Sequence, residues 1–205
     1  MSTFPIRDIL KSLSVTRPVF HSEADFQFSL SWKIKELFPE ADIRLEIPFG
    51  KKKKEYLDIL VKLKDEVIPI ELKYKTKKTK LIHDNEYFYL KNHGAYNVNR
   101  YAILKDVERI ERFIEENNCS QGYSIILSND STYWNLNDKD TLDKEFSIQE
   151  GKLITGKLQW TEIVKETYIR KAPIHLQNRY LSKWDTYSQL DNTQIKMLIF
   201  SKDVT

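Results

Sequence analysis

Cysteine, glycine and long apolar runs are scarce in this sequence. Of its 205 residues one is cysteine and five are glycine. A single cysteine, Cys119, excludes an internal disulfide, and it has no Cys or His partner at the spacing of a zinc site. No apolar run approaches the roughly 18–20 residues that a membrane-spanning helix needs. We therefore expect neither a disulfide framework, nor a structural zinc site, nor a membrane partner.

A targeting segment and a disorder signature are also missing. The residues after Met1 contain no apolar core followed by a small-residue cleavage site, so we expect a cytoplasmic protein. Hydrophobic residues make up 40% of the chain, which is enough for a buried core. The length suits one domain and is too short for two domains and a linker. We predict a single domain over residues 1–205, with a core at about 20–130 and a β-rich extension at about 131–205.

Positive charge is concentrated in one stretch of the chain. The formal net charge is only +3, but the segment from Lys51 to Lys80 contains eleven lysines against five acidic residues. The rest of the chain therefore carries a net charge of −3. A lysine-rich stretch is most often a solvated face, so the chemistry around it decides whether it has a function.

Capping and periodicity predict two helices. Ser22 fits an N-cap with Asp25 at the capping-box position, which predicts a helix over about residues 23–38. The same segment also alternates apolar and polar residues at the period of a strand. We favour the helix, because its length suits a helix and four apolar residues lie on one helical face: Phe26, Leu30, Ile34 and Leu37. Helical spacing predicts the second helix from Ile103, Val107, Ile110 and Ile114.

Short apolar runs separated by turn residues predict strands in the rest of the chain. Three antiparallel strands are expected at 43–48, 56–63 and 67–74, and the tight turn at 64–66 makes the last two a hairpin. A buried strand at 122–127 follows the second helix. The last third offers four candidates without a clear order: 152–158, 174–177, 180–187 and 195–200. The order of elements predicts an α/β (α+β) fold, in which helices pack on a mixed sheet.

The hairpin places acidic and basic side chains on one face. Successive strand residues point to opposite faces, which separates Asp58 from four apolar residues of its strand: Leu57, Ile59, Val61 and Leu63. In the next strand Glu71 and Lys73 share a face. Asp58 meets them only if it lies opposite Glu71 or Lys73, and never opposite Leu72. A slip of one residue in the pairing would separate these side chains.

Such a face suits a divalent metal ion. Two converging carboxylates repel each other unless a cation neutralises them. Mg²⁺ takes one or two carboxylates and keeps several waters, so Asp58, Glu71 and the backbone carbonyl of Leu72 would suffice, with Mn²⁺ as a second candidate. Lys73 is placed to polarise a water and to stabilise charge on a phosphate. The competing interpretation is a cross-strand salt bridge, since a second Glu-x-Lys triplet at 150–152 arises by chance.

A family resemblance favours the metal site. The sequence Tyr-Leu-Asp-Ile-Leu at 56–60, followed by Ile-Glu-Leu-Lys-Tyr-Lys-Thr at 70–76, resembles the PD-(D/E)xK nuclease superfamily, although Leu57 replaces the proline. The resemblance implies the restriction-endonuclease-like fold: a mixed four-stranded β-sheet flanked by helices, here with additional C-terminal β-strands. It also implies that a glutamate of the first core helix approaches the metal, and Glu23 is in the matching place. Further segments are similar to a bacterial group of this fold without assigned function.

The expected activity is metal-dependent hydrolysis of nucleic acid by an endonuclease, and we favour DNA over RNA as the substrate. Its catalytic residues would be Asp58, Glu71, Lys73 and Glu23, and its metal ligands Asp58, Glu71, Leu72 and Glu23. The alternative is a catalytically silent or partner-dependent module of the same fold that binds nucleic acid or protein. The sequence leaves open whether the chain forms a homodimer and whether it binds an unidentified protein partner.

Basic residues just before the first strand of the hairpin and just after Lys73 are the candidate nucleic-acid ligands, because lysines that neutralise phosphates give non-specific affinity. These two chain ends are neighbours at the open end of the hairpin. The candidate lysines are Lys51, Lys52, Lys53, Lys54, Lys75, Lys77, Lys78 and Lys80. Arg100 can contact a phosphate or join a surface ion-pair set with Asp106 and Arg109. The segment 80–99 can be a flap over the substrate or an ordinary loop. For the tryptophans we favour core positions over base stacking: Trp134, Trp160 and Trp184.

Overall fold

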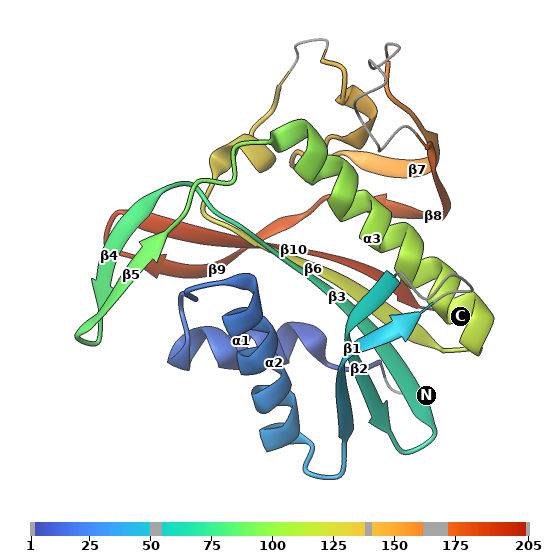
Figure 1. Ribbon diagram of the computed structural model, residues 1–205, viewed down its shortest axis with the longest axis horizontal. Coiled ribbons are helices and arrows are strands. Elements are labelled where there is room, and N and C mark those ends of the chain that lie inside the picture. The colour runs from blue at the N-terminus through green and yellow to red at the C-terminus, as the bar shows by residue number, and fades with distance from the viewer. Residues whose placement is uncertain (1–2, 50–54, 138–140, 162–171, 204–205) are drawn as a thin grey trace.

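A mixed six-stranded sheet forms the middle layer of the computed structural model, which describes residues 3–49, 55–137, 141–161 and 172–203 (Figure 1). The strand order is β1-β2-β3-β6-β10-β9, and only β3 and β6 are parallel neighbours. The strands are β1 (Asp42–Phe49), β2 (Glu55–Leu63), β3 (Glu66–Lys75), β6 (Gln121–Ser128), β9 (Trp184–Leu190) and β10 (Thr193–Asp203). The predicted mixed sheet is confirmed, and its two further strands come from the C-terminal third, since β10 pairs with β6 and β9 pairs with β10.

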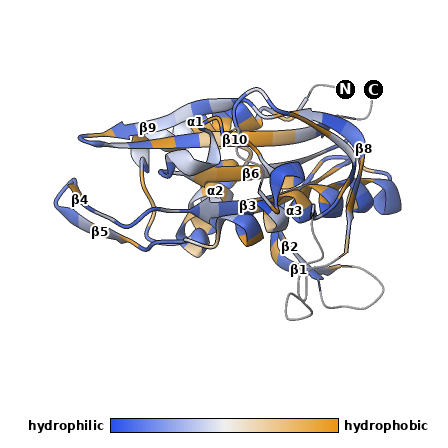
Figure 2. Cartoon of the chain, turned by 90° about the horizontal axis from the view of Figure 1, so that it is seen from above, coloured by the Kyte–Doolittle hydropathy of each residue, from blue (hydrophilic) through white to orange (hydrophobic). Residues whose placement is uncertain are grey.

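Helices cover both faces of this sheet. α1 (Ile6–Thr16) and α2 (Glu23–Leu37) pack on one face, and α3 (Tyr96–Asn117) packs on the other beside the two-stranded sheet of β7 (Leu153–Leu158) and β8 (Ile174–Leu181). Strand β6 is buried along its whole length because both faces of the sheet are covered, and part of it is strongly hydrophobic (Figure 2). No helix within the described ranges is long and apolar enough to cross a membrane.

The predicted helix at 23–38 is confirmed as α2. The Ser22 hydroxyl accepts a hydrogen bond from the Asp25 N–H at 3.1 Å, which closes the first turn. The helical face predicted from sequence is buried at Phe26, Leu30 and Ile34. The competing strand pattern came from aromatic residues that lie on the outer face of the helix, where Phe28 is 62% and Trp32 78% exposed.

The C-terminal third is anchored to α3 by a buried carboxylate. Glu111 accepts hydrogen bonds from the backbone N–H groups of Gln177 and Asn178 and from the hydroxyl of Tyr180, each at 2.9 Å. The strand predicted at 180–187 is divided between β8 and β9. The three tryptophans named above pack in the hydrophobic cluster between α3 and β8, as predicted.

The segment expected as a flap or loop contains a β-hairpin. β4 (Thr79–His83) and β5 (Glu86–Leu90) pair with each other only, and they project from one end of the molecule (Figures 1 and 2). We call residues 79–90 the β4–β5 arm.

Gly122 allows α3 to lie close to the sheet. A Cβ atom at this position would lie 2.9 Å from side-chain atoms of Ile114 and Pro69 and 3.0 Å from Ile110. Two of these neighbours belong to α3 and one to β3, so any side chain here would push the helix away from the strand that carries Glu71.

We expect Gly122→Ala to lower the free energy of unfolding by about 1–3 kcal/mol, because the added methyl group overpacks a rigid contact. Urea unfolding measures the change. The matched control is Gly94→Ala, whose Cβ would meet only the rotatable side chain of Asn92 at 3.0 Å. We expect this control to change stability by less than about 1 kcal/mol. Equal effects of the two substitutions would show that the contact at Gly122 is not tight.

Candidate active site

The candidate site lies where β2 and β3 part. Their last regular pair is Ile59 with Ile70, so continuing the ladder would place Asp58 opposite Glu71. This is one of the two pairings that the candidate site requires, since it does not place Asp58 opposite Leu72. Beyond this point β3 turns two backbone N–H groups toward carboxylates instead of β2. Asp58 Oδ2 accepts from the Leu72 N–H at 2.6 Å, and Glu23 Oε2 accepts from the Tyr74 N–H at 2.8 Å.

The faces of β2 differ from the prediction near Asp58. Ile59 and Val61 share a face, as predicted, and pack with α1 and α2, but Leu57 packs with Leu60 against α3. Simple alternation therefore fails at Asp58. On β1, the residue that continues the pairing opposite Asp58 is Glu46, which has a left-handed φ of 51°. A non-glycine residue with this φ inside a strand is strained, and such strain concentrates at functional sites.

Glu71 is the most deeply buried carboxylate of the site, with 1% of its surface exposed. Its Oε1 atom lies 2.7 Å from Nη1 of Arg109, whereas its buried Oε2 atom has no hydrogen-bond partner. Burial raises the pKa of Glu71 well above its ordinary value, and the charges of Asp106 and Asp58 raise it further. Burial also raises the pKa of Asp58.

Lys73 is held among carboxylates on the same face as Glu71. Its Nζ atom lies 2.7 Å from Asp106 Oδ2 and 3.9 Å from Glu23 Oε1, and it donates to the Leu72 carbonyl at 2.9 Å. Burial by itself would lower the pKa of Lys73, but the charges of Asp106, Glu23 and Asp58 raise it above the ordinary lysine value. Lys73 is therefore a permanent cation at neutral pH.

Helix α3 contributes Asp106 and Arg109, which the sequence interpretation considered only as members of a surface ion-pair set with Arg100. Asp106 is 3% exposed, and its Oδ1 atom lies 3.2 Å from Nη2 of Arg109, which also holds Glu71. A signal for this was present in the sequence. Asp106 lies among Ile103, Val107 and Ile110 on the apolar face of α3, where an unpaired charged residue is rarely found.

Gln27 of α2 also belongs to the candidate site, and no pattern in the sequence indicated it. Its Nε2 atom donates to the backbone carbonyl of Asp58 at 2.7 Å and to Glu46 Oε1 at 2.9 Å. Gln27 therefore holds the backbone of β2 at the position from which Asp58 projects.

Arg100 lies in a different environment. It is 7% exposed, its Nη1 atom lies 2.8 Å from Asp143 Oδ2, and its Nη2 atom donates to the Thr132 carbonyl. It fastens α3 to the C-terminal third, so the structure does not bring it to the candidate site.

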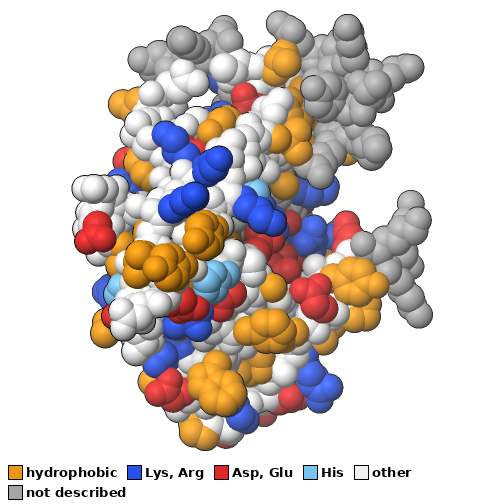
Figure 3. Space-filling model, turned by 60° about the vertical axis from the view of Figure 1, so that its left-hand side comes forward, with side chains coloured by type: hydrophobic (Ala, Val, Ile, Leu, Met, Phe, Trp, Pro, Cys, Tyr) orange, Lys and Arg blue, Asp and Glu red, His pale blue; other side chains and the backbone are white. Residues whose placement is uncertain are grey.

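The predicted lysines divide into two groups. Lys75 forms an ion pair with Glu23 at 3.4 Å, whereas three lysines after it are exposed: Lys77, Lys78 and Lys80. Figure 3 shows Lys and Arg side chains beside a hydrophobic patch and a recess lined by acidic side chains. The other four, Lys51, Lys52, Lys53 and Lys54, lie outside the described residues.

The donor set fits a hydrated Mg²⁺ or Mn²⁺ ion. Glu71 offers an unpartnered oxygen, and Asp58 is fixed by the Leu72 N–H. The Leu72 carbonyl already accepts from Lys73, but a carbonyl oxygen has a second lone pair. Among the described residues no group of three or more His, Cys, Asp or Glu is placed to hold a metal. A complete protein cage is not what Mg²⁺ needs, since it usually keeps several waters.

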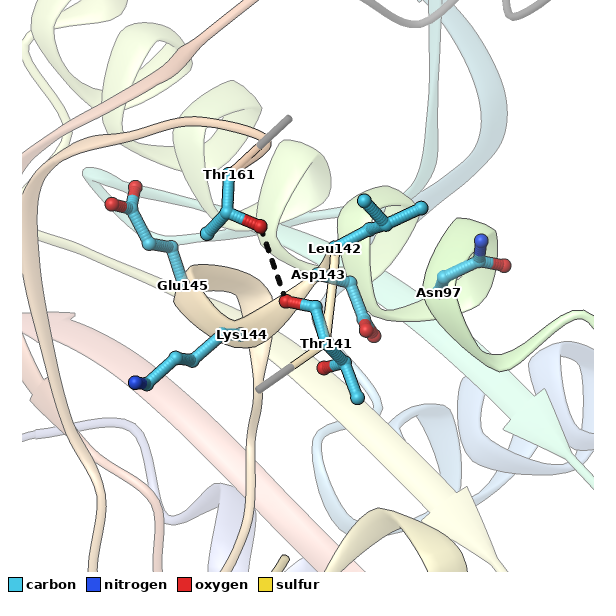
Figure 4. A pocket seen from close by; sticks show the side chains of 7 residues that line it. All are labelled: Asn97, Thr141, Leu142, Asp143, Lys144, Glu145 and Thr161. Carbon is cyan, nitrogen blue, oxygen red and sulfur yellow. Dashed lines mark hydrogen bonds between the residues drawn. The ribbon is translucent and has the colours of Figure 1, made fainter. Parts of the chain in front are cut away.

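A separate hollow of about 930 Å³ lies beside the start of α3 (Figure 4). Its lining residues are Asn97, Thr141, Leu142, Asp143, Lys144, Glu145 and Thr161. The Thr161 hydroxyl donates to the Thr141 carbonyl at 3.3 Å, and Asp143 is engaged by Arg100. The hollow contains none of the residues gathered at the parting of β2 and β3.

Comparisons of the chain with protein-family models, with curated proteins and with solved structures find no match. The resemblance of residues 56–60 and 70–76 to the PD-(D/E)xK superfamily thus stays an expectation from the sequence.

We expect Arg109→Met to lower the free energy of unfolding by about 3 kcal/mol, because the buried carboxylate of Glu71 loses its ion-pair partner and Asp106 keeps only Lys73. Adding Glu71→Gln should restore part of the loss, since it removes one of the two charges. Urea unfolding in the presence of a chelator measures both effects.

The control for this experiment is Arg112→Met on the same helix. The Arg112 side chain is 41% exposed and pairs with Glu55, so we expect a loss of about 1 kcal/mol or less. If Arg109→Met costs no more than this control, the ion pairs of the candidate site do not stabilise the fold.

Proposed function

We propose that the chain is a metal-dependent nuclease of the cytoplasm that hydrolyses phosphodiester bonds of nucleic acid. We favour DNA over RNA as its substrate. The observation that carries the proposal is the convergence of Asp58, Glu71 and Lys73 at the parting of β2 and β3. Their spacing resembles that of PD-(D/E)xK nucleases, and Glu23 reaches the same place from α2. We assign β1, β2, β3 and β6 with α2 and α3 to a restriction-endonuclease-like core, to which the later strands are added.

Asp58 and Glu71 are the proposed metal ligands. A bound Mg²⁺ ion supplies Lewis acidity and lowers the pKa of a coordinated water. Burial is the main cause of the raised pKa of both carboxylates, and their mutual repulsion adds to it for Glu71, so a cation between them would stabilise their charged forms. Arg109 holds one oxygen of Glu71 and leaves the other without a hydrogen-bond partner.

Lys73 has an electrostatic role in this proposal. Because its ammonium group stays protonated, it donates hydrogen bonds to a water or a phosphate oxygen and does not act as a base. Asp106 is a positioning residue, since its carboxylate lies 2.7 Å from the Lys73 Nζ atom and fixes its direction.

A second candidate is a module of the same fold that binds nucleic acid without cleaving it. One observation favours it: Arg109 already neutralises part of Glu71, and Lys73 already occupies the Leu72 carbonyl. A metal ion would have to compete with these two cations.

The first test is cleavage of plasmid, linear and single-stranded DNA and of RNA, with Mg²⁺ or Mn²⁺ and with chelator. We expect metal-dependent cutting that falls at least about a hundredfold in Asp58→Asn, Glu71→Gln and Lys73→Met, because each removes a ligand or a charge from the transition state. Lys62→Met is the control, since Lys62 is an exposed lysine on the strand of Asp58. Cutting that survives Asp58→Asn or Lys73→Met would exclude this mechanism.

Metal binding is tested separately from turnover by titration calorimetry with Mn²⁺. We expect the unmodified protein to bind the ion, and Asp58→Asn and Glu71→Gln to bind it at least about tenfold more weakly, since each loses one anionic ligand. Binding without cleavage of any substrate would favour the silent module. An affinity that is unchanged in both variants would place the ion elsewhere.

A further inference from the structure

The β4–β5 arm presents an aromatic and basic surface that the fold does not use. Residues alternate along the hairpin, and four of them point outward as two cross-strand pairs, Lys80 with Tyr89 and Ile82 with Tyr87. Ile82 is 54% exposed, and Tyr87 and Tyr89 are each 60% exposed. We call these four residues the outer face of the arm.

The inner face of the arm provides its attachment. Phe88 and Leu90 are buried in the main hydrophobic core, with 2% and 3% of their surface exposed. The His21 ring stacks on Phe88 with centroids 4.4 Å apart, and its Nε2 atom lies 2.7 Å from Glu86 Oε1. The outer tyrosines are therefore not needed to hold the arm in place.

The base of the arm is fixed to the strand that carries the candidate site. Thr76 follows Lys73 on the same chain segment, and its hydroxyl donates to the Lys91 carbonyl at 2.6 Å. The His93 N–H donates to the Thr76 carbonyl at 2.8 Å, and Asn129 Oδ1 accepts from the Lys77 N–H at 2.8 Å. These contacts hold the arm in a defined direction relative to β3 and β6.

The outer face combines two features that bind unpaired nucleotides. The rings of Tyr87 and Tyr89 are parallel to within 10° with centroids 6.5 Å apart, and the Lys80 Nζ atom lies 5.7 Å from the Tyr89 centroid. Every base has a flat face that stacks on an aromatic ring, and exposed lysines attract the phosphates. Bases inside a duplex are already stacked on each other, so they do not offer these faces.

We propose that the outer face of the arm binds unpaired nucleotides, so that the substrate class is nucleic acid with a single-stranded segment beside the cleaved bond. The part about cleavage rests on the proposed nuclease function, whereas the binding surface stands on the arm itself. Lys77 and Lys78 are exposed between the site strand and the arm, and with Lys80 of the arm they provide positive charge along the path between the two.

The test is fluorescence anisotropy of labelled oligonucleotides in chelator, which prevents cleavage. The probes are a single strand, a blunt duplex and a duplex with a single-stranded overhang. We expect the double variant Tyr87→Ala/Tyr89→Ala to bind the single strand and the overhang at least about tenfold more weakly, with less than about a threefold change for the blunt duplex. Tyr87→Phe/Tyr89→Phe keeps both rings and should bind as the unmodified protein does.

The matched control is Phe28→Ala/Trp32→Ala, which removes an aromatic pair of α2 that is at least as exposed as the two tyrosines. We expect this variant to leave binding of all three probes unchanged. Equal binding by Tyr87→Ala/Tyr89→Ala and the unmodified protein overturns the inference, and so does an unmodified protein that binds none of the probes, which would point to a protein ligand for the arm.

The inference and the nuclease function fail in different ways. A protein that cleaves, but whose Tyr87→Ala/Tyr89→Ala variant binds and cleaves single strands normally, retains the nuclease function and refutes the role of the arm. A protein that binds single strands through these tyrosines and never cleaves refutes the nuclease function and supports the binding surface.

Discussion

The parting of β2 from β3 beyond the pair Ile59 and Ile70 is the constraint on which the candidate site depends. A buried backbone N–H must find an acceptor, and β2 no longer supplies one to Leu72 and Tyr74. Side-chain carboxylates accept these hydrogen bonds in place of backbone carbonyls: Asp58 of β2 accepts from Leu72, and Glu23 of α2 accepts from Tyr74. The backbone thereby gathers negative charge at a single point, and the cationic residues of β3 and α3 are needed to keep that charge inside the fold.

Local signals predicted the parts of the structure that local forces decide. The Ser22 cap fixed the start of α2, and the alternation of β3 put Glu71 and Lys73 on one face. The turn is one residue shorter than predicted: Lys64 and Asp65 form it, and Glu66 already pairs with Leu63. A turn at 64–66 would have placed Leu72 opposite Asp58, so the register depends on this one residue. These features predicted most of the residues of the candidate site and the antiparallel neighbours β1, β2 and β3, whereas the parallel pairing of β3 with β6 had no local signal.

Contacts between distant segments decided the rest. Arg100 and Arg109 are both arginines of the same helix, yet one meets Asp143 of the C-terminal third and the other meets Glu71 of β3. Periodicity gives no means of telling them apart, because each partner is brought by a different long-range contact. The left-handed φ of Glu46 had no sequence signal either, since neither glycine nor asparagine marks it.

The parallel pairing of β3 with β6 has a consequence for how such a protein can change over time. Parallel neighbours need a long crossover connection, and here that crossover consists of the β4–β5 arm followed by α3. The arm is thus part of a connection that is long in any case. Its length and surface can vary between descendants while the pairing of β3 and β6 stays the same. The proposed binding surface and the proposed metal site therefore lie on separate segments of one chain, and one can change without the other.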